Sequence, residues 1–134
     1  MKTTDLRLGN FISINFGNRD DGKVITVDGV SDCEIYNEEY GYSPCNEFNP
    51  IPLTEQWLLD FGFNQSIEGQ WYIHFDEMCL TIYEDLPQYI VEIHDMEMDK
   101  SSIFLKSIQY VHQLQNLYFA LTQEELILKE RIEQ

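Results

Sequence analysis

The sequence predicts an α+β fold, and three observations lead to this prediction. Between Tyr110 and Leu121, apolar residues recur at steps of three or four, as in a helix that packs along one side. Residues 6–36 contain short apolar segments separated by turn residues, and three longer apolar segments lie between residues 71 and 94. We therefore expect an N-terminal three-stranded meander, a short helix, an antiparallel β-meander and a C-terminal amphipathic helix packed on the sheet.

One domain is expected for a chain of 134 residues, which is long enough to bury a core without disulfides or metal ions. Within it, residues 1–49 form the N-terminal meander and an aromatic loop, and residues 50–134 form the rest. In the first part, residues 6–15 alternate apolar and polar side chains before the turn-rich segment 17–22. A second strand at 23–27, a turn at Asp28-Gly29 and a third strand at 30–36 complete a meander typical of an SH3-like partial barrel.

Residues 36–49 read as a long connector that is rich in aromatic and acidic residues. Loops of this length often carry function, and exposed tyrosines make good contact residues because they bury a large area with little loss of entropy. This makes Tyr36, Tyr40, Tyr42 and Phe48 candidate interaction residues. The alternative is that Tyr40, Tyr42 and Phe48 fold back as a lid on the core.

A short helix is predicted after the extended Pro50-Ile51-Pro52 segment. Thr54 is its N-cap, Leu53 can pack on Leu58, and Gly62 ends it in a left-handed conformation. Trp57, Leu58 and Phe61 give this helix an apolar face.

Three strands follow at 71–75, 78–84 and 89–94, joined by short loops. Tight hairpins would align Ile73 with Leu80 and Ile93, and would place Trp71, Ile82 and Val91 in a second apolar row on the same face. On the opposite face the same register aligns His74, Cys79 and His94. These residue types could bind a metal ion, but strands stand about 5 Å apart, so the two histidines are too far from each other to share one zinc without a bend in the sheet.

The C-terminal helix begins after Ser107, a candidate N-cap, and its apolar stripe is expected to close one face of the sheet formed by the strands at 71–94. Its other side bears the amides Gln109, Gln113 and Asn116 in place of charged residues, so we expect part of this side to be covered. His112 stands alone near core positions, which favours a structural hydrogen bond over acid–base chemistry. A capping-box pattern at residues 122–125 predicts a separate short helix that extends to Ile132.

The charge balance limits the possible partners. The chain has 24 Asp and Glu against 8 Lys and Arg, which gives a formal net charge of −16. Binding of nucleic acid or of an anionic membrane depends on clustered Lys and Arg, so we expect neither. Acidic residues favour solubility, and the sharper alternative is a nucleic-acid mimic that presents carboxylates to a basic protein groove.

The cysteines Cys33, Cys45 and Cys79 are odd in number and lack CxxC spacing, so they predict neither a disulfide framework nor a zinc site. Reduced thiols suit the cytoplasm. The first residues form no apolar signal segment, and no apolar run approaches the ~20 residues of a membrane helix. We expect a soluble, cytoplasmic protein.

Three segments resemble a family of small acidic proteins encoded by Bacteroides-type gut bacteria, their phages and their mobile elements. The segments are LRLGN at 6–10, IPLTEQWLLDFGF at 51–63 and YVHQLQNLYFALTQEEL at 110–126. The resemblance implies a Bacteroidales or phage setting and no activity. Residues 127–134 run past the point where such proteins often end, so no terminal contact is carried over.

No GxSxG, HExxH, P-loop or paired-carboxylate motif is present in the sequence, and none of its residues predicts a cofactor. We therefore expect a non-enzymatic accessory or protein-interaction module whose partner is a protein. A nucleic-acid mimic that inhibits a basic DNA-binding protein is the first alternative, and a small metal-binding or hydrolytic protein is the second. The oligomeric state does not follow from the sequence.

Overall fold

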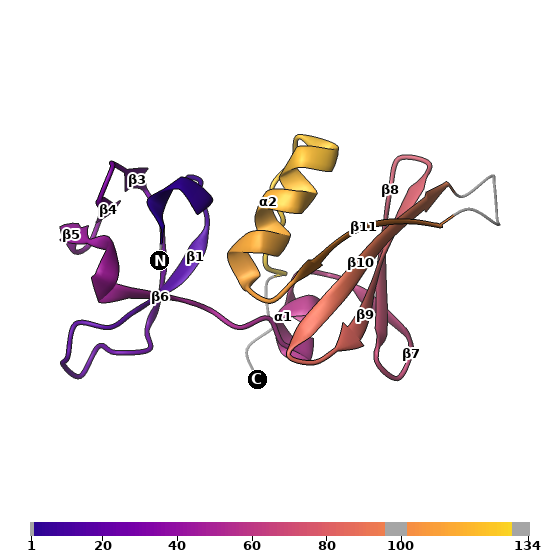
Figure 1. Cartoon of the computed structure of the whole chain (residues 1–134), viewed down its shortest axis with the longest axis horizontal. Coiled ribbons are helices and arrows are strands. Elements are labelled where there is room, and N and C mark those ends of the chain that lie inside the picture. The colour runs from indigo at the N-terminus through magenta and orange to yellow at the C-terminus, as the bar shows by residue number, and fades with distance from the viewer. Residues whose placement is uncertain (1, 96–101, 130–134) are drawn as a thin grey trace. The chain divides into compact units, whose positions relative to one another are not determined.

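The computed structural model describes residues 2–95 and 102–129, and it contains both helices and antiparallel sheets (Figure 1). The α+β prediction is therefore confirmed. Contacts within the chain define two compact units. Unit 1 comprises Met1–Pro52 and Tyr110–Glu125, and unit 2 comprises Leu53–Gln109 and Leu126–Gln134.

Unit 1 contains two small antiparallel sheets. Strands β2 (Val24–Thr26), β1 (Phe11–Ile14) and β6 (Phe48–Pro50) form one sheet in that order, and β3 (Gly29–Val30), β4 (Glu34–Asn37) and β5 (Gly41–Pro44) form a three-stranded meander. The 3-10 helices η1 (Thr3–Asp5) and η2 (Cys45–Glu47) complete this part. The N-terminal meander is thus confirmed, although the expected strand at 30–36 divides into β3 and β4.

The prediction of a long connector at residues 36–49 is wrong, because this segment forms the end of β4, β5, η2 and the start of β6. The backbone reverses at Gly41, whose φ of +75° favours glycine. Residues Gly41–Pro44 then pair with β4. The aromatic residues that suggested a binding loop belong mainly to these paired strands.

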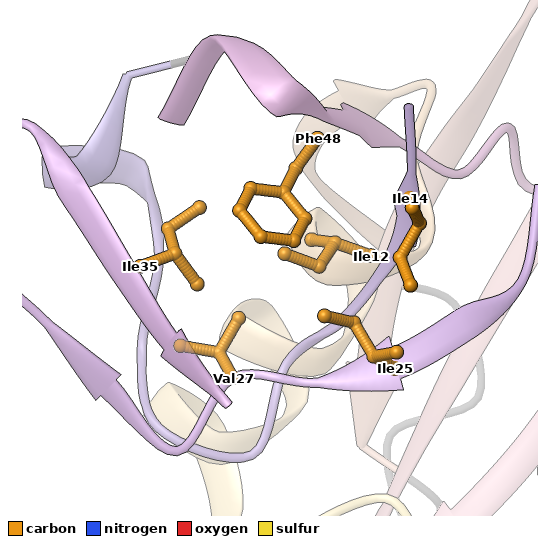
Figure 2. Packing of buried hydrophobic residues seen from close by; sticks show 6 residues of the cluster. All are labelled: Ile12, Ile14, Ile25, Val27, Ile35 and Phe48. Carbon is orange, nitrogen blue, oxygen red and sulfur yellow. The ribbon is translucent and has the colours of Figure 1, made fainter. Parts of the chain in front are cut away.

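The core of unit 1 is a cluster of six apolar side chains between its strands, and Figure 2 shows them pointing toward one another. They are Ile12, Ile14, Ile25, Val27, Ile35 and Phe48. Because these residues come from β1, β2, β4, β6 and the segment after β2, the cluster joins both sheets. Each is at most 6% exposed, so their burial stabilises the arrangement by the hydrophobic effect.

Helix α2 (Val111–Thr122) packs on the sheet that contains β1, so the prediction of a helix packed on a sheet is confirmed, and this sheet is the N-terminal one of unit 1 rather than the one formed by the strands at 71–94. The start predicted at Ser107 is wrong, because Ser107 and Ile108 continue strand pairing. Tyr110 is the N-cap, and its N–H donates a hydrogen bond to Gln113 Oε1 at 3.0 Å.

Helix α2 ends at Gln123, which has a left-handed φ of 63° and donates its N–H to the Phe119 carbonyl at 2.7 Å. No further helix forms at residues 123–129, so the predicted short helix is wrong over this range, and Ile132 lies outside the described residues. Thr122 Oγ1 accepts the Glu124 N–H at 3.0 Å but also donates to Tyr118. The side chain thus closes α2 and does not start a new helix.

Unit 2 contains helix α1 (Glu55–Asp60), and its predicted N-cap and terminal glycine are confirmed. Thr54 Oγ1 accepts the Trp57 N–H at 3.4 Å, and Gly62 has a φ of +95° directly after the helix. Leu58 and Phe61 are buried.

The sheet of unit 2 has the strand order β11-β10-β9-β8-β7, and all its pairs are antiparallel. The strands are β7 (Asn64–Ile67), β8 (Gln70–Phe75), β9 (Met78–Asp85), β10 (Gln88–Asp95) and β11 (Ser102–Ile108). Both predicted apolar rows are confirmed residue by residue. Strand β7 was not expected, because its four side chains are exposed and show no apolar alternation.

Candidate interaction surface

Tyr36 and Tyr42 form an aromatic pair on the β3-β4-β5 meander of unit 1. They are direct cross-strand partners, and their ring centroids lie 4.9 Å apart at an interplanar angle of 48°. Tyr42 is 65% exposed, whereas Tyr36 is half-buried. Two of the four predicted interaction residues therefore come together at the surface, on paired strands.

Gly29 provides the space for this pair. It lies opposite Tyr36 in the β3–β4 ladder, and a Cβ at position 29 would lie 3.1 Å from Tyr36 Cβ. Contacts this short are rare between real side chains, so a larger residue would displace the tyrosine. Glycine at this position thus lets the Tyr36 side chain lie close to β3.

The other two predicted interaction residues pack inward. Phe48 is 2% exposed and belongs to the core cluster, and Tyr40 packs against that cluster. The Phe16 ring contacts both in edge-on geometry, with centroids 5.5 Å apart in each case. The alternative of aromatic residues folded back on the core therefore describes Tyr40 and Phe48, and it does not describe Tyr42.

Lys23 contacts Tyr40, one of the aromatic residues that pack inward. Its Nζ lies 3.2 Å from Glu39 Oε2, donates to Tyr40 Oη at 3.0 Å and lies 5.3 Å from the Tyr40 ring centroid. The hydrogen bonds to Tyr40 and Glu39 raise the pKa of Lys23 above its usual value. Lys23 is therefore paired within the chain, and its positive charge offsets the negative charge of Glu39.

Acidic side chains also contribute to the surface of unit 1. A surface hollow beside β2 and β4 is lined by Asp28, Asn37, Glu38 and Glu39 together with Lys23, Val24, Ile25 and Thr26. Asp28 Oδ2 accepts the Glu38 N–H at 2.8 Å, and Asn37 Nδ2 donates to the Thr26 carbonyl at 2.9 Å. The sequence contains no lysine or arginine between Lys23 and Lys100. The β3-β4-β5 meander therefore carries acidic side chains without a cation of its own.

The row of His74, Cys79 and His94 in unit 2 is confirmed as a register. Cys79 is only 4% exposed, and its Sγ lies 3.9 Å from Thr81 Oγ1. The exposed His74 ring lies edge-on to the Tyr72 ring, with centroids 5.2 Å apart. Within residues 2–95 and 102–129, no three His, Cys, Asp or Glu side chains are grouped so that they could hold a metal ion.

His112 is 4% exposed, and its Nδ1 has no hydrogen-bond partner among the residues that the structure describes. The expected structural hydrogen bond is therefore missing at this nitrogen. Its ring lies parallel to the Tyr110 ring, with centroids 6.0 Å apart. Burial lowers the pKa of His112 below its usual value, and the nearby Asp5 carboxylate raises it by a smaller amount.

Gln115 is a residue that the sequence pattern did not single out. It is 1% exposed on α2, and its amide binds the backbone on both sides of Asn10. The neighbouring Asn116, predicted to be covered, accepts from Asn10 Nδ2 at 2.8 Å and donates to the Asp5 carbonyl at 3.0 Å. The run of uncharged amides on the helix was the sequence feature that could have pointed to Gln115. It indicated which side of the helix is covered, but it did not identify this residue.

Two further exposed apolar side chains lie at an edge of the unit 2 sheet. Ile103 and Phe104 of the edge strand β11 are 62% and 59% exposed. In the part of the chain that the structure describes, no helix has the length and apolar character needed to cross a membrane.

Comparisons with protein-family models, with curated proteins and with solved structures found no match to this chain.

Proposed function

We propose that this chain is a non-enzymatic, cytoplasmic accessory module that binds a basic protein through the Tyr36–Tyr42 pair. The observation that carries the proposal is a cross-strand tyrosine pair with an exposed Tyr42, on a meander that carries acidic side chains and no lysine or arginine. Tyrosine is enriched at binding hot spots, because it buries a large area and retains a polar tip. A pair held on paired strands also loses less entropy on binding than a mobile loop would.

The charge of the surface favours a cationic partner. Asp28, Glu38 and Glu39 line a hollow beside β4, the strand that carries Tyr36, and among them Glu39 has a described cation partner, Lys23. Arginine or lysine side chains of a partner could pair with these carboxylates and lie over the tyrosine rings. Complementary charge would increase the association rate, and binding should weaken as salt rises.

A photo-crosslinking amino acid at position 42 tests the surface. The matched control places the same amino acid at Phe104, an aromatic residue of similar exposure in unit 2. We expect one basic protein to be crosslinked at position 42 and not at position 104. Its purified form should bind the unmodified chain at least about tenfold more tightly than the Tyr42→Ala variant, as for a hot-spot residue. Equal crosslinking at both positions, or crosslinking at position 104 alone, would reject the surface.

A nucleic-acid mimic is the second candidate, and the absence of lysine and arginine between Lys23 and Lys100 favours it. A mimic would bind a DNA-binding protein and compete with DNA for it, with a steep salt dependence. The two candidate functions depend on different side chains. The double variant Glu38→Gln/Glu39→Gln should abolish competition by a mimic, whereas Tyr42→Ala should abolish binding through the tyrosine pair.

The resemblance to proteins of Bacteroides-type bacteria and their phages supports a phage-derived origin as part of the proposal. It also indicates where to look for the partner, among proteins encoded near this chain in such genomes. Sequencing of the flanking genes checks this setting, and flanking genes without relation to Bacteroidales or their phages would speak against it.

A further inference from the structure

Cys33 and Cys45 lie next to each other at one end of the β4–β5 ladder. Cys33 directly precedes β4, Cys45 directly follows β5, and the Cys45 N–H donates to the Cys33 carbonyl at 3.0 Å. Both residues line one surface hollow, together with Glu34, Pro44 and Asn46. Two cysteines that are twelve positions apart in the sequence thus line the same hollow.

The ladder register determines how the two cysteines face each other. Glu34 pairs with Pro44, which has no N–H, so this pair is of the non-hydrogen-bonded kind. The next pair toward the end of the ladder, Cys33 with Cys45, should then be hydrogen-bonded. The hydrogen bond from the Cys45 N–H to the Cys33 carbonyl agrees with this alternation. Opposed residues of such a pair have Cα atoms about 5.5 Å apart and side chains on the same face. That separation is within the range of about 4.4–6.8 Å between Cα atoms that a disulfide requires, whereas the Cβ atoms of opposed residues stand about 4.5–5.5 Å apart and must approach each other to reach the usual range of about 3.5–4.5 Å.

The two thiols differ in access. Cys33 is exposed, whereas Cys45 is half-buried and packs against the core cluster of unit 1. Cys79, in unit 2, is buried. A reagent in solution therefore reaches Cys33 first, and Cys45 is the thiol placed to react with a modified Cys33.

We propose that Cys33 and Cys45 form a dithiol site that exchanges with low-molecular-weight disulfides such as oxidised glutathione. The Cys33 thiol loses its proton to water, and the thiolate attacks one sulfur of the small disulfide. This forms a mixed disulfide and releases one small thiolate, which takes up a proton. Cys45 then loses its proton to water, and its thiolate attacks Cys33 Sγ, forms the internal disulfide and releases the second small thiolate, which takes up a proton. The two cysteines are oxidised, and one small disulfide is reduced to two thiols.

The test is incubation of the reduced full-length chain with oxidised glutathione, followed by alkylation and mass spectrometry. After unfolding and alkylation, we expect one alkyl group, at Cys79, and the loss of two hydrogen atoms at Cys33 and Cys45, whereas the reduced chain should carry three alkyl groups. The disulfide should raise the thermal midpoint by about 5–10 °C, because it restricts the unfolded chain, and a reductant should reverse the shift.

Matched variants assign each step. Cys45→Ser should accumulate the mixed disulfide at Cys33, because the resolving thiol is absent. Cys33→Ser should react much more slowly, and Cys79→Ser should behave as the unmodified chain does. A stable glutathione adduct at Cys33 in the unmodified chain would overturn the proposal, as would a disulfide that includes Cys79 or joins two chains.

Discussion

The side-chain amide of Gln115 binds the main chain at Phe11, with its Oε1 accepting the Phe11 N–H at 2.8 Å. Its Nε2 donates to the Gly9 carbonyl at 3.0 Å. Gln115 is 1% exposed, so these two backbone groups satisfy an amide that would otherwise be buried at a cost in free energy. This contact joins helix α2 to the segment that leads into β1.

Replacement of Gln115 by alanine should lower the free energy of unfolding by about 2–4 kcal/mol. The reason is that the variant leaves the Phe11 N–H and the Gly9 carbonyl without this partner and opens a cavity. Urea denaturation followed by circular dichroism measures the loss. The control is Gln65→Ala on the exposed strand β7, which should change stability by less than about 0.5 kcal/mol. Equal losses in the two variants would contradict the role of Gln115.

A second contact joins the same parts of unit 1 through Arg7. Its guanidinium binds the Glu125 carboxylate through both NH groups, donates to Asn116 Oδ1 at 3.2 Å and lies 4.2 Å from the Phe119 ring centroid. Lysine keeps the charge but cannot reproduce this planar geometry. Because the pair is partly exposed, we expect Arg7→Lys to cost only about 1 kcal/mol in chemical denaturation.

A double-mutant cycle with Glu125→Gln isolates the ion pair. The coupling energy should be about 0.5–1 kcal/mol at low salt and should fall at about 1 M salt, where the screening length is about 3 Å. The more exposed Lys23–Glu39 pair is the comparison, and its coupling should be smaller. A coupling of zero for Arg7 and Glu125 at low salt would contradict the assigned contact.

Much of the unit 2 sheet could be predicted from sequence, because tight hairpins transmit register from one strand to the next. The alignment of Ile73 with Leu80 and Ile93 follows once the turns at Asp76-Glu77 and Leu86-Pro87 are short. Helix α1 could be predicted equally well, because its N-cap and its terminal glycine are local signals in the sequence. Strand β7 carried no such signal, because its pairing depends on β8 alone and not on its own apolar pattern.

The surroundings of the candidate interaction surface could be predicted less well from the sequence, because long-range contacts determine which aromatic residues pack inward. Tyr40 and Tyr42 are separated only by Gly41, yet Tyr40 packs on Phe16 while Tyr42 is exposed. Sequence spacing indicated neither the Phe16 contact nor the opposition of Tyr36 and Tyr42. The pairing of Cys33 with Cys45 depends in turn on the position of the β4–β5 hairpin, which the sequence pattern concealed within an apparent connector.

The buried His112 should make stability depend on pH. Burial lowers its folded-state pKa below the usual 6.5, so the unfolded chain binds the proton more strongly. The contribution of neutral His112 is therefore complete above about pH 6.5 and decreases as pH falls from there toward the folded-state pKa. The slope is at most about 1.4 kcal/mol per pH unit for one group.

The measurement compares the free energy of unfolding of the unmodified chain and of His112→Gln between about pH 7.5 and 5.5. Many carboxylates also titrate near the lower end of this range, so the difference between the two proteins is the informative quantity. It should decrease as the pH falls. A difference that stays constant across the range would show that His112 has the same proton affinity in both states.

Phe48 and Tyr42 should respond in opposite ways to truncation, although both are aromatic residues of the segment that suggested a binding loop. Phe48 is 2% exposed in the core cluster, so Phe48→Ala should cost about 3–5 kcal/mol of stability. Tyr42 is 65% exposed and contacts mainly Tyr36, so Tyr42→Ala should cost less than about 1 kcal/mol. Thermal and urea denaturation of both variants distinguish the two roles. If Tyr42→Ala destabilised the chain as much as Phe48→Ala does, Tyr42 would be a structural residue, and the proposed interaction surface would lose its main support.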